Sequence, residues 1–437
     1  MAQPLKLGVA GLGNVGAALV AQLAREREQL AARCGRAIEV VAVCARNKGK
    51  DRGLDLKKMK WFADPVALAR DPGIDVFVEL IGGAGDPARA AVKAALAAGK
   101  SVVTANKALL AKQGVQLAML AEKNGVALNF EAAAAAAIPI VKTLREGLAG
   151  NRVARIYGIL NGTCNYILTK MEQEQLPFAD CLKEAQRLGY AEADPSFDIE
   201  GHDTAQKLSI LASLAFGSKV DERAIYVEGI SSIQPADLAA ADELGYRVKL
   251  LGVAVRTPQG IEQRVHPTML RKDSSIAQVM GVTNAVTVDA EGLNPLTLVG
   301  PGAGGMATAS AVLSDIADIA RGLKVAPFGR PAGKLASVRK APMQRHEGGY
   351  YIRLLARDRP GTAATIAKRL AEQKISLESI VQRHPKGEPV GEGKAGAVPV
   401  ILITYATSED AVRKALAAVG RDRVISGSPQ VIRIEKN

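Results

Sequence analysis

Short apolar runs alternate with longer amphipathic stretches over roughly the first third of the chain. The runs are LKLGVAG, IEVVAVC, DVFVELIG, SVVTANK and VALNFEA. They are rich in β-branched and small residues, whereas the stretches between them are alanine-rich and amphipathic. This alternation is typical of βαβ units, and it predicts an α/β domain over residues 1–135 with a doubly wound parallel sheet.

The middle of the chain, residues 136–308, follows another pattern. Helical periodicity covers residues 178–188 and 203–214, and alternating strand-like runs follow at 248–255 and 285–292. This order predicts an α+β domain. A further helical stretch at 309–325 is expected to pack back on the first domain and complete it.

The last part of the chain begins with a segment rich in Pro, Gly and Lys, residues 326–349, which we interpret as a linker. Residues 350–437 then show the order strand, helix, strand, strand, helix, strand. This βαββαβ order predicts a ferredoxin-like domain.

Composition narrows the class of partner. The net charge is +13, but the basic residues are spread among acids and aromatic residues make up only 4%, so a surface for anionic small molecules is favoured over a nucleic-acid site. No apolar run reaches the ~18 residues of a membrane span. No signal-peptide pattern precedes the first strand, so we expect a cytoplasmic protein.

The cysteines and histidines give no sign of a metal centre. No CxxC pair is present, and no two of the four histidines are spaced at i and i+4, so we expect reduced thiols and no zinc site. The cysteines are Cys34, Cys44, Cys164 and Cys181.

A glycine fingerprint lies in LGVAGLGNVGAAL, directly after the first strand and before a helix. Gly11 permits a tight turn, Gly13 lets the backbone approach a pyrophosphate, and Gly16 allows close packing of helix and strand. The helix N-terminus offers free N–H groups to phosphates. We therefore predict a Rossmann-type dinucleotide site formed by Gly11, Leu12, Gly13, Asn14, Val15 and Gly16.

The end of the second strand bears on which nicotinamide cofactor binds. Sites for NAD carry Asp or Glu there, but this strand ends Cys44-Ala45-Arg46-Asn47-Lys48. Arg46 can stack on the adenine or pair with a 2′-phosphate, although an arginine facing solvent would fit the same pattern. NADP(H) is favoured, with NAD(H) as the alternative.

Two lysines are candidates for chemistry. Lys107 follows a strand at the edge where ligands bind in open α/β sheets, although a surface lysine would fit there too. Asp203 and Lys207 are four residues apart at the start of a helix and share one face. A lysine that is held by an aspartate is suited to transfer a proton to a substrate oxygen during hydride transfer. The alternative is that the two residues form an ordinary salt bridge on the helix. The nearby acids Glu192 and Asp198 are suited to bind an ammonium group.

The chain resembles the homoserine dehydrogenase family over essentially its full length. The resemblance is carried by GLGNVG, TANK, NFEA…IPIVKTLREGL, GILNGTCNYIL, GYAEADPSFDIEGHDTAQKL and GPGAGGMATASAVLSD. It implies NAD(P)-dependent interconversion of L-homoserine and L-aspartate 4-semialdehyde on the route to threonine and methionine. It also implies a monofunctional homodimer or homotetramer, with residues 136–308 binding substrate and forming the dimer.

The resemblance also implies roles for single residues. Lys207 would be the proton donor, supported by Asp203, and Lys107 would lie near the nicotinamide and the reacting oxygen. Glu192, Asp198 and Asp203 would hold the substrate amino group and its surroundings. The remaining assignments are Thr163 and Tyr190 as pocket residues, and Gly189 and Gly304 as cofactor contacts.

A monovalent cation, Na⁺ or K⁺, is implied as well. Its ligands would be Glu131 and the backbone of Ala134, Ala136 and Ile138. The family loop reads close to EAxVAGGIPI, whereas this chain has alanine throughout residues 132–137. The run fits either a helix or a loop whose small side chains leave the backbone accessible. If the glycines of the family loop need positive φ, alanine at these positions would strain the loop.

Residues 350–437 resemble an ACT domain, which implies an amino-acid effector, with threonine expected. Asp358-Arg359-Pro360-Gly361 precedes a helix whose N–H groups suit a carboxylate. A purely structural dimerisation module is the alternative. For the whole chain, the alternatives are another NADP-linked amino-acid semialdehyde reductase and a non-catalytic sensor of dinucleotide and amino acid.

Overall fold

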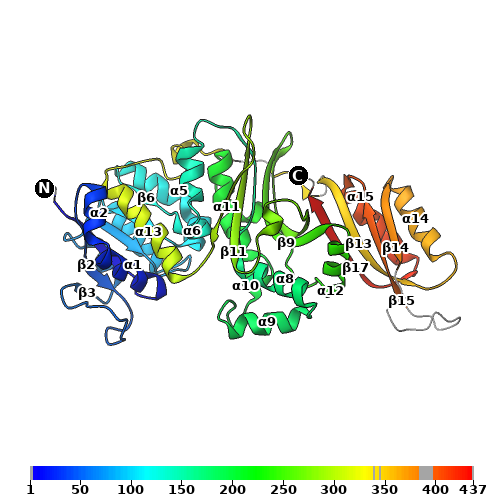
Figure 1. The fold of residues 1–437 in the computed structure, drawn as a ribbon. Helices are drawn as coiled ribbons and strands as arrows, with labels where there is room; N and C mark the ends of the chain where they lie inside the picture. The colour runs from blue at the N-terminus through cyan, green and yellow to red at the C-terminus, as the bar shows by residue number, and fades with distance from the viewer. Residues whose placement is uncertain (1–2, 338–339, 344–345, 383–396, 436–437) are drawn as a thin grey trace.

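The computed structural model describes residues 3–337, 340–343, 346–382 and 397–435. Three units follow one another along an elongated molecule, with the N-terminal unit at one end and the C-terminal unit at the other (Figure 1). The predicted fold class, a parallel α/β unit followed by an α+β unit and a ferredoxin-like unit, is confirmed. Residues 338–339 and 344–345 of the predicted linker, and Arg383 of a predicted strand, lie outside the described residues.

The N-terminal unit is built on a parallel sheet. Six strands pair within the described residues in the order β3-β2-β1-β4-β5-β6. The strands are β1 (Leu5–Ala10), β2 (Ile38–Cys44), β3 (Lys60–Phe62), β4 (Val76–Glu79), β5 (Ser101–Thr104) and β6 (Leu128–Asn129). The helices are α1 (Asn14–Arg25), α2 (Arg27–Cys34), α3 (Pro65–Arg70), α4 (Ala88–Ala97) and α5 (Lys107–Lys123). The strand order reverses between β1 and β4, which places a ligand crevice at the carboxyl ends of these strands.

Helix α13 (Gly305–Ala320) returns to this unit from far along the chain, and Figure 1 shows it beside α1. Its Val312 and Ile316 share one buried apolar cluster with Leu19 and Leu23 of α1. The predicted return is therefore seen, but the helix begins and ends earlier than the predicted range 309–325.

The middle unit combines a mixed sheet with a buried helix. Its helices are α6 (Ala132–Ala135), α7 (Ile140–Lys142), the π-turn η1 (Thr143–Gly147), α8 (Gly162–Glu174), α9 (Phe178–Arg187), α10 (Ser196–Ile199), α11 (His202–Phe216) and α12 (Pro235–Glu243), with short 3₁₀ turns η2 (Glu222–Ala224) and η3 (Ile276–Gln278). Its strands are β7 (Val153–Ile159), β8 (Tyr226–Val227), β9 (Tyr246–Thr257), β10 (Gly260–Arg271), β11 (Thr283–Ala290) and β12 (Leu296–Pro301). Helix α11 buries Ala205, Leu208 and Leu211 in the main core, so its position is set by apolar packing.

The C-terminal unit has the predicted βαββαβ order. It comprises β13 (Glu347–Arg357), α14 (Thr362–Glu372), β14 (Leu377–Gln382), β15 (Ala397–Thr404), the short strand β16 (Thr407–Ser408), α15 (Glu409–Arg421) and β17 (Ile425–Glu435), after the 3₁₀ turn η4 (Ala332–Lys334). Apolar residues of both helices, such as Ile366 and Val412, pack on one face of the sheet.

An unpredicted contact joins the last two units into one sheet. Strand β17 pairs in parallel with β10 from Thr268–Arg433 to Leu270–Glu435. Within the described residues an eleven-stranded sheet results. Nine strands follow the order β12-β11-β7-β9-β10-β17-β13-β15-β14, and β8 and β16 pair at its side. Strand pairing, as well as the connecting segment, therefore joins the C-terminal unit to the middle unit.

Buried ion pairs reinforce this joint. The Arg264 guanidinium, almost fully buried, pairs with Glu262 and with Glu435 of β17. Arg353 of β13 donates to both oxygens of Asp237 on α12, at 2.6 and 3.1 Å. Separating the partners would leave a buried charge uncompensated, which disfavours any shift between the two units.

The cysteines match their predicted state. Cys34, Cys44, Cys164 and Cys181 are free and buried. Burial raises the pKa of the Cys44 and Cys181 thiols to about 11, which keeps both in the unreactive thiol form. Among the described helices, none has the length and apolar character needed to cross a bilayer.

Candidate active site

A cleft of about 690 Å³ lies between the parallel-sheet unit and the middle unit. Helices α5, α6, α8 and α11 and the segment 301–304 supply its walls. The predicted site residues that line it are Val15, Lys107, Ala134, Ala136, Thr163, Gly189, Tyr190, Glu192, Asp198, Asp203, Lys207 and Gly304. The fold thus brings together residues predicted from segments far apart in the sequence.

The glycine turn before α1 has the geometry of a phosphate cradle. A Cβ on Gly11 would lie 2.3 Å from the carbonyl oxygen of Leu80, and one on Gly16 would lie 2.0 Å from that of Gly11. Nothing lies within 4 Å of the Cβ position of Gly13. Because α1 begins at Asn14, this open space faces the free N–H groups of a helix N-terminus, which suits a pyrophosphate.

Arg46 lies exposed beyond the end of β2, outside the cleft. Sequence reasoning missed a second arginine, Arg52, which ties this region to the glycine turn. Its Nε donates to the carbonyl oxygen of Leu12 at 3.2 Å, and its NH2 group donates to that of Asn47 at 2.6 Å. An isolated arginine in an irregular segment carries no periodic signal, so only the folded structure reveals this contact.

Asp203 links the two candidate lysines. Its Oδ2 lies 2.7 Å from Nζ of Lys207, and its Oδ1 lies 3.2 Å from Nζ of Lys107. Nζ of Lys207 also donates to the carbonyl oxygen of Leu160 at 2.7 Å. The lysines come from α11 and from the first residue of α5, so one carboxylate joins the two units at the floor of the cleft.

The charge state of Asp203 follows from these contacts. Burial alone would raise its pKa, but the charges of Lys207 and Lys107 outweigh this effect and bring the pKa to about 2. Asp203 therefore remains a carboxylate at neutral pH. By contrast, burial and the neighbouring Asp203 raise the pKa of Asp198.

Asn161 is a site residue that sequence reasoning missed. Its Oδ1 accepts from the N–H of Cys164 at 2.8 Å and so caps α8. Its Nδ2 donates to Asp198 at 2.8 Å and to Asp203 at 2.9 Å. One buried amide thus positions both carboxylates. An Asn before a helical pattern is a recognisable cap signal, but it does not reveal the second function.

The predicted substrate residues form the outer part of the cleft. The hydroxyl of Thr163 donates to the carbonyl oxygen of Tyr190 at 2.6 Å. The Tyr190 ring stacks edge-on against Tyr166, with centroids 5.0 Å apart. Glu192 is exposed at the cleft wall. An acid at the entrance and Asp198 deeper inside provide negative charge for a cationic group.

Comparison with known proteins decides the family. Family models described as "Homoserine dehydrogenase", "Homoserine dehydrogenase, NAD binding domain" and "ACT domain" match residues 139–317, 11–131 and 350–421. The homoserine dehydrogenase of Neisseria gonorrhoeae is 42% identical over 99% of both chains, and that of Pseudomonas aeruginosa is 43% identical over 99% of both. This chain belongs to the homoserine dehydrogenase family.

Solved structures of the homoserine dehydrogenase family agree. The homoserine dehydrogenase of Thiobacillus denitrificans has a TM-score of 0.92 and 43% identity, covering 99% of this chain and 98% of that one. A hyperthermophilic archaeal homoserine dehydrogenase, described as in complex with NADPH, has a TM-score of 0.61 and 29% identity, covering 72% of this chain and 97% of that one. The resemblance seen in the sequence is confirmed.

The alanine run combines both structures that the sequence left open. Ala132–Ala135 forms helix α6, and Ala136 then turns with φ +45° and ψ −109°. Ala137 is not among the residues with positive φ. Of the two positions where homoserine dehydrogenases were expected to have glycine, only Ala136 therefore adopts a conformation that favours glycine.

Glu131 and Asp315 form a buried acidic pair behind this loop. The Glu131 carboxylate accepts the N–H groups of Val141 at 2.8 Å and Lys142 at 2.9 Å. Its own N–H donates to Oδ2 of Asp315 at 2.8 Å. Burial raises the pKa of Glu131, and burial followed by the nearby Glu131 raises that of Asp315 to about 7.

The oxygens near this pair bear on the predicted cation. Oδ1 of Asp315 is buried and has no hydrogen-bond partner among the described residues. The carbonyl oxygen of Ile138 accepts from the N–H of Ile140 at 2.7 Å. No three His, Cys, Asp or Glu side chains of the described part of the chain gather as a metal site. Any cation here would therefore depend on a carboxylate and backbone oxygens.

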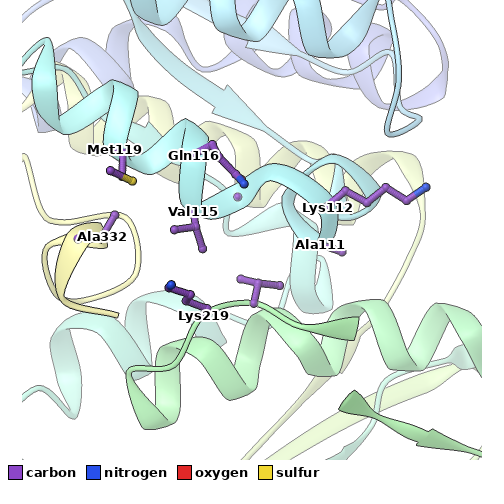
Figure 2. A pocket seen from close by; sticks show the side chains of 10 residues that line it. Ala111, Lys112, Val115, Gln116, Met119, Lys219 and Ala332 are labelled. Carbon is purple, nitrogen blue, oxygen red and sulfur yellow. The ribbon is translucent and has the colours of Figure 1, made fainter. Parts of the chain in front are cut away.

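A second hollow, of about 410 Å³, lies beside the middle of α5 (Figure 2). Met119 and Val115 of α5 face Ala332 and Lys219 across it, as Figure 2 shows. None of its described lining residues is an acid, a histidine or a cysteine. The lysines and acids predicted for catalysis and substrate binding line the cleft instead.

Replacing Ala136 with glycine should stabilise the protein. A non-glycine residue in such a conformation costs about 1–3 kcal/mol, and the extra freedom of glycine in the unfolded chain offsets about 0.4–1 kcal/mol. We expect Ala136→Gly to raise the free energy of unfolding in urea by about 1 kcal/mol. The control Ala135→Gly, in helical backbone, should lower it by about as much. A lower free energy of unfolding in both variants would show that Ala136 is not strained.

Proposed function

We propose that this chain catalyses the reversible NAD(P)-dependent interconversion of L-aspartate 4-semialdehyde and L-homoserine. The observation that carries the proposal is the Asp203 carboxylate, held between Lys107 and Lys207 in a cleft beside a dinucleotide-type glycine turn. Membership of the homoserine dehydrogenase family supports it.

Reduction of the aldehyde adds a hydride to carbon and a proton to oxygen. The nicotinamide, when bound, supplies the hydride and takes it back in the reverse reaction. In our proposal the Lys207 ammonium donates the proton, and Leu160 and Asp203 hold its Nζ in place. Lys107 adds a second positive charge near the oxygen, which stabilises the negative charge that develops there.

The acids of the cleft would orient the substrate. Asp198 and Glu192 provide carboxylates for the substrate ammonium, while Thr163 and Tyr190 shape the pocket around it. Gly189 and Gly304, which line the cleft, leave room for the cofactor. This arrangement would fix the aldehyde carbon in one place, which is the main requirement for hydride transfer.

We expect Lys207→Met to lower kcat for NADPH oxidation with aspartate 4-semialdehyde by about 10²–10⁴-fold, the usual effect of removing a general acid. NADPH binding, followed by fluorescence, should be unchanged because Lys207 lies outside the glycine turn. Lys183→Met, at an exposed lysine of α9, is the matched control. If Lys207→Met kept full turnover, Lys207 would be excluded as the proton donor.

For the cofactor we propose a preference for NADP(H), with NAD(H) also accepted. Arg46, Lys48 and Lys50 are exposed cations beyond the end of β2, where a 2′-phosphate would lie. The archaeal relative described as in complex with NADPH supports this choice.

Arg46→Ala should raise the KM for NADPH about tenfold, because a charge-assisted contact is worth about 1.5–3 kcal/mol before solvent screening. The KM for NADH, which lacks the 2′-phosphate, should change little. Arg33→Ala, on α2, is the control. Equal effects on both cofactors would point to stacking on the adenine instead.

We further propose a monovalent cation, Na⁺ or K⁺, at Glu131 with backbone oxygens of Ala134, Ala136 and Ile138. The donor set is compatible with such an ion because it consists of hard oxygens. The unpartnered Oδ1 of Asp315, whose other oxygen accepts from the N–H of Glu131, adds a further buried oxygen to this set.

For regulation we propose that the C-terminal unit binds an amino-acid effector, threonine. Asp358 to Gly361 are exposed before α14, whose N-terminal N–H groups suit a carboxylate. We also propose a homodimer or homotetramer. The exposed Leu293, Leu296 and Val299, in and next to edge strand β12, support a further protein contact there.

A further inference from the structure

The segment between β2 and β3 carries three cations but has no regular structure. Within the described residues, no helix or strand lies between Cys44 and Lys60. Arg46, Lys48 and Lys50 are exposed in the first half of this segment. A backbone outside a helix or sheet has to be ordered when its side chains bind an anion, and this ordering costs affinity. The strength of an anion site here therefore depends on what already holds the segment in place.

Apolar packing holds only the second half. Leu54, Leu56 and Met59 pack against the buried cluster that contains Leu12 of the glycine turn. Residues 46–50 are all exposed and take no part in that cluster. The cation-bearing half therefore relies on polar contacts.

Arg52 lies between the two halves and makes such contacts. Its guanidinium donates to the backbone carbonyl oxygens of Leu12 at 3.2 Å, Asn47 at 2.6 Å and Lys50 at 2.7 Å. Its Cζ also lies 5.7 Å from the centroid of the Trp61 ring, within range of a cation–π contact. One side chain thus ties the cation-bearing half to the glycine turn.

The glycine turn itself has other supports. The side chain of Leu12 is buried in the apolar cluster. The N–H of Gly11 donates to the carbonyl oxygen of Cys44 at 2.9 Å, which fixes the start of the turn on β2. Loss of Arg52 should therefore loosen residues 46–50 more than the turn.

We propose that Arg52 is a positioning residue for the 2′-phosphate of NADP(H), because it preorders the backbone that carries Arg46, Lys48 and Lys50. This inference rests on the proposed preference for NADP(H). Three of the five N–H groups of the guanidinium are directed at backbone carbonyls. Arg52 therefore acts by holding the segment, and the neighbouring cations supply the charge that meets the phosphate.

The test measures the Kd of NADP⁺ and of NAD⁺ by isothermal titration calorimetry, which requires no turnover. In Arg52→Met the Kd of NADP⁺ should rise about tenfold, as expected when about one residue more has to be ordered on binding. The Kd of NAD⁺, which lacks the 2′-phosphate, should stay unchanged. Arg52→Lys keeps the charge but cannot reproduce the planar fork, so its Kd for NADP⁺ should rise nearly as much.

A double variant tests whether Arg52 acts through its neighbours. If it does, the effects of Arg46→Ala and Arg52→Met overlap, and together they raise the Kd of NADP⁺ by less than the product of the two single effects. Arg27→Met is the matched control. Arg27 of α2 pairs with Glu39 at 2.6 Å in the same unit, outside the segment, so both Kd values should stay unchanged.

Three outcomes overturn the role of Arg52. Wild-type affinity for NADP⁺ in Arg52→Lys would make the role one of charge, and equal rises for both cofactors in Arg52→Met would place it in the glycine turn. Fully independent effects in the double variant would separate Arg52 from Arg46. In all three cases the preference of the wild-type chain for NADP⁺ still stands. A wild-type chain that binds NAD⁺ as tightly as NADP⁺ would instead reject that preference, and the inference with it.

Discussion

One buried carboxylate holds the two halves of the cleft together. Asp203 on α11 contacts Lys207 on the same helix and Lys107 at the start of α5, so it joins the middle unit to the parallel-sheet unit through charge. Burial raises the pKa of this carboxylate, but the charges of Lys207 and Lys107 lower it to about 2, so Asp203 stays ionised. The position of the proposed proton donor depends on this contact.

Asn161 connects Asp203 to other parts of the cleft. Asn161 holds Asp203 and Asp198 with one amide, and it caps α8 with the other end of the same group. The start of α8 thereby becomes part of the cleft.

The C-terminal unit shares a continuous sheet with the middle unit, and the buried Arg264 and its acidic partners stabilise this joint. An effector bound to the C-terminal unit would therefore act on strands that are continuous with the sheet of the middle unit.

Local signals predicted much of this fold, because periodicity and glycine spacing are properties of neighbouring residues. The glycine turn, the Asp203–Lys207 pair at helix spacing and the βαββαβ order were all visible in this way. The contact of Lys107 with Asp203 depends on tertiary packing, and it was not predicted. The family resemblance implied only that Lys107 lies near the nicotinamide and the reacting oxygen. The pairing of β10 with β17 and the binding of two acids by Asn161 carry no local signal. Ala136 is a further case, since an alanine run indicates helix and not a residue with positive φ.

The most direct test of this account is the turnover of Asp203→Asn with NADPH and aspartate 4-semialdehyde, measured alongside NADPH affinity. An amide of the same shape lacks the charge that holds both lysines. We expect kcat to fall by about 10²-fold or more, as when a general acid is misplaced, while NADPH affinity is unchanged. Turnover close to that of the wild-type enzyme would contradict it, because the lysines would then be positioned without Asp203.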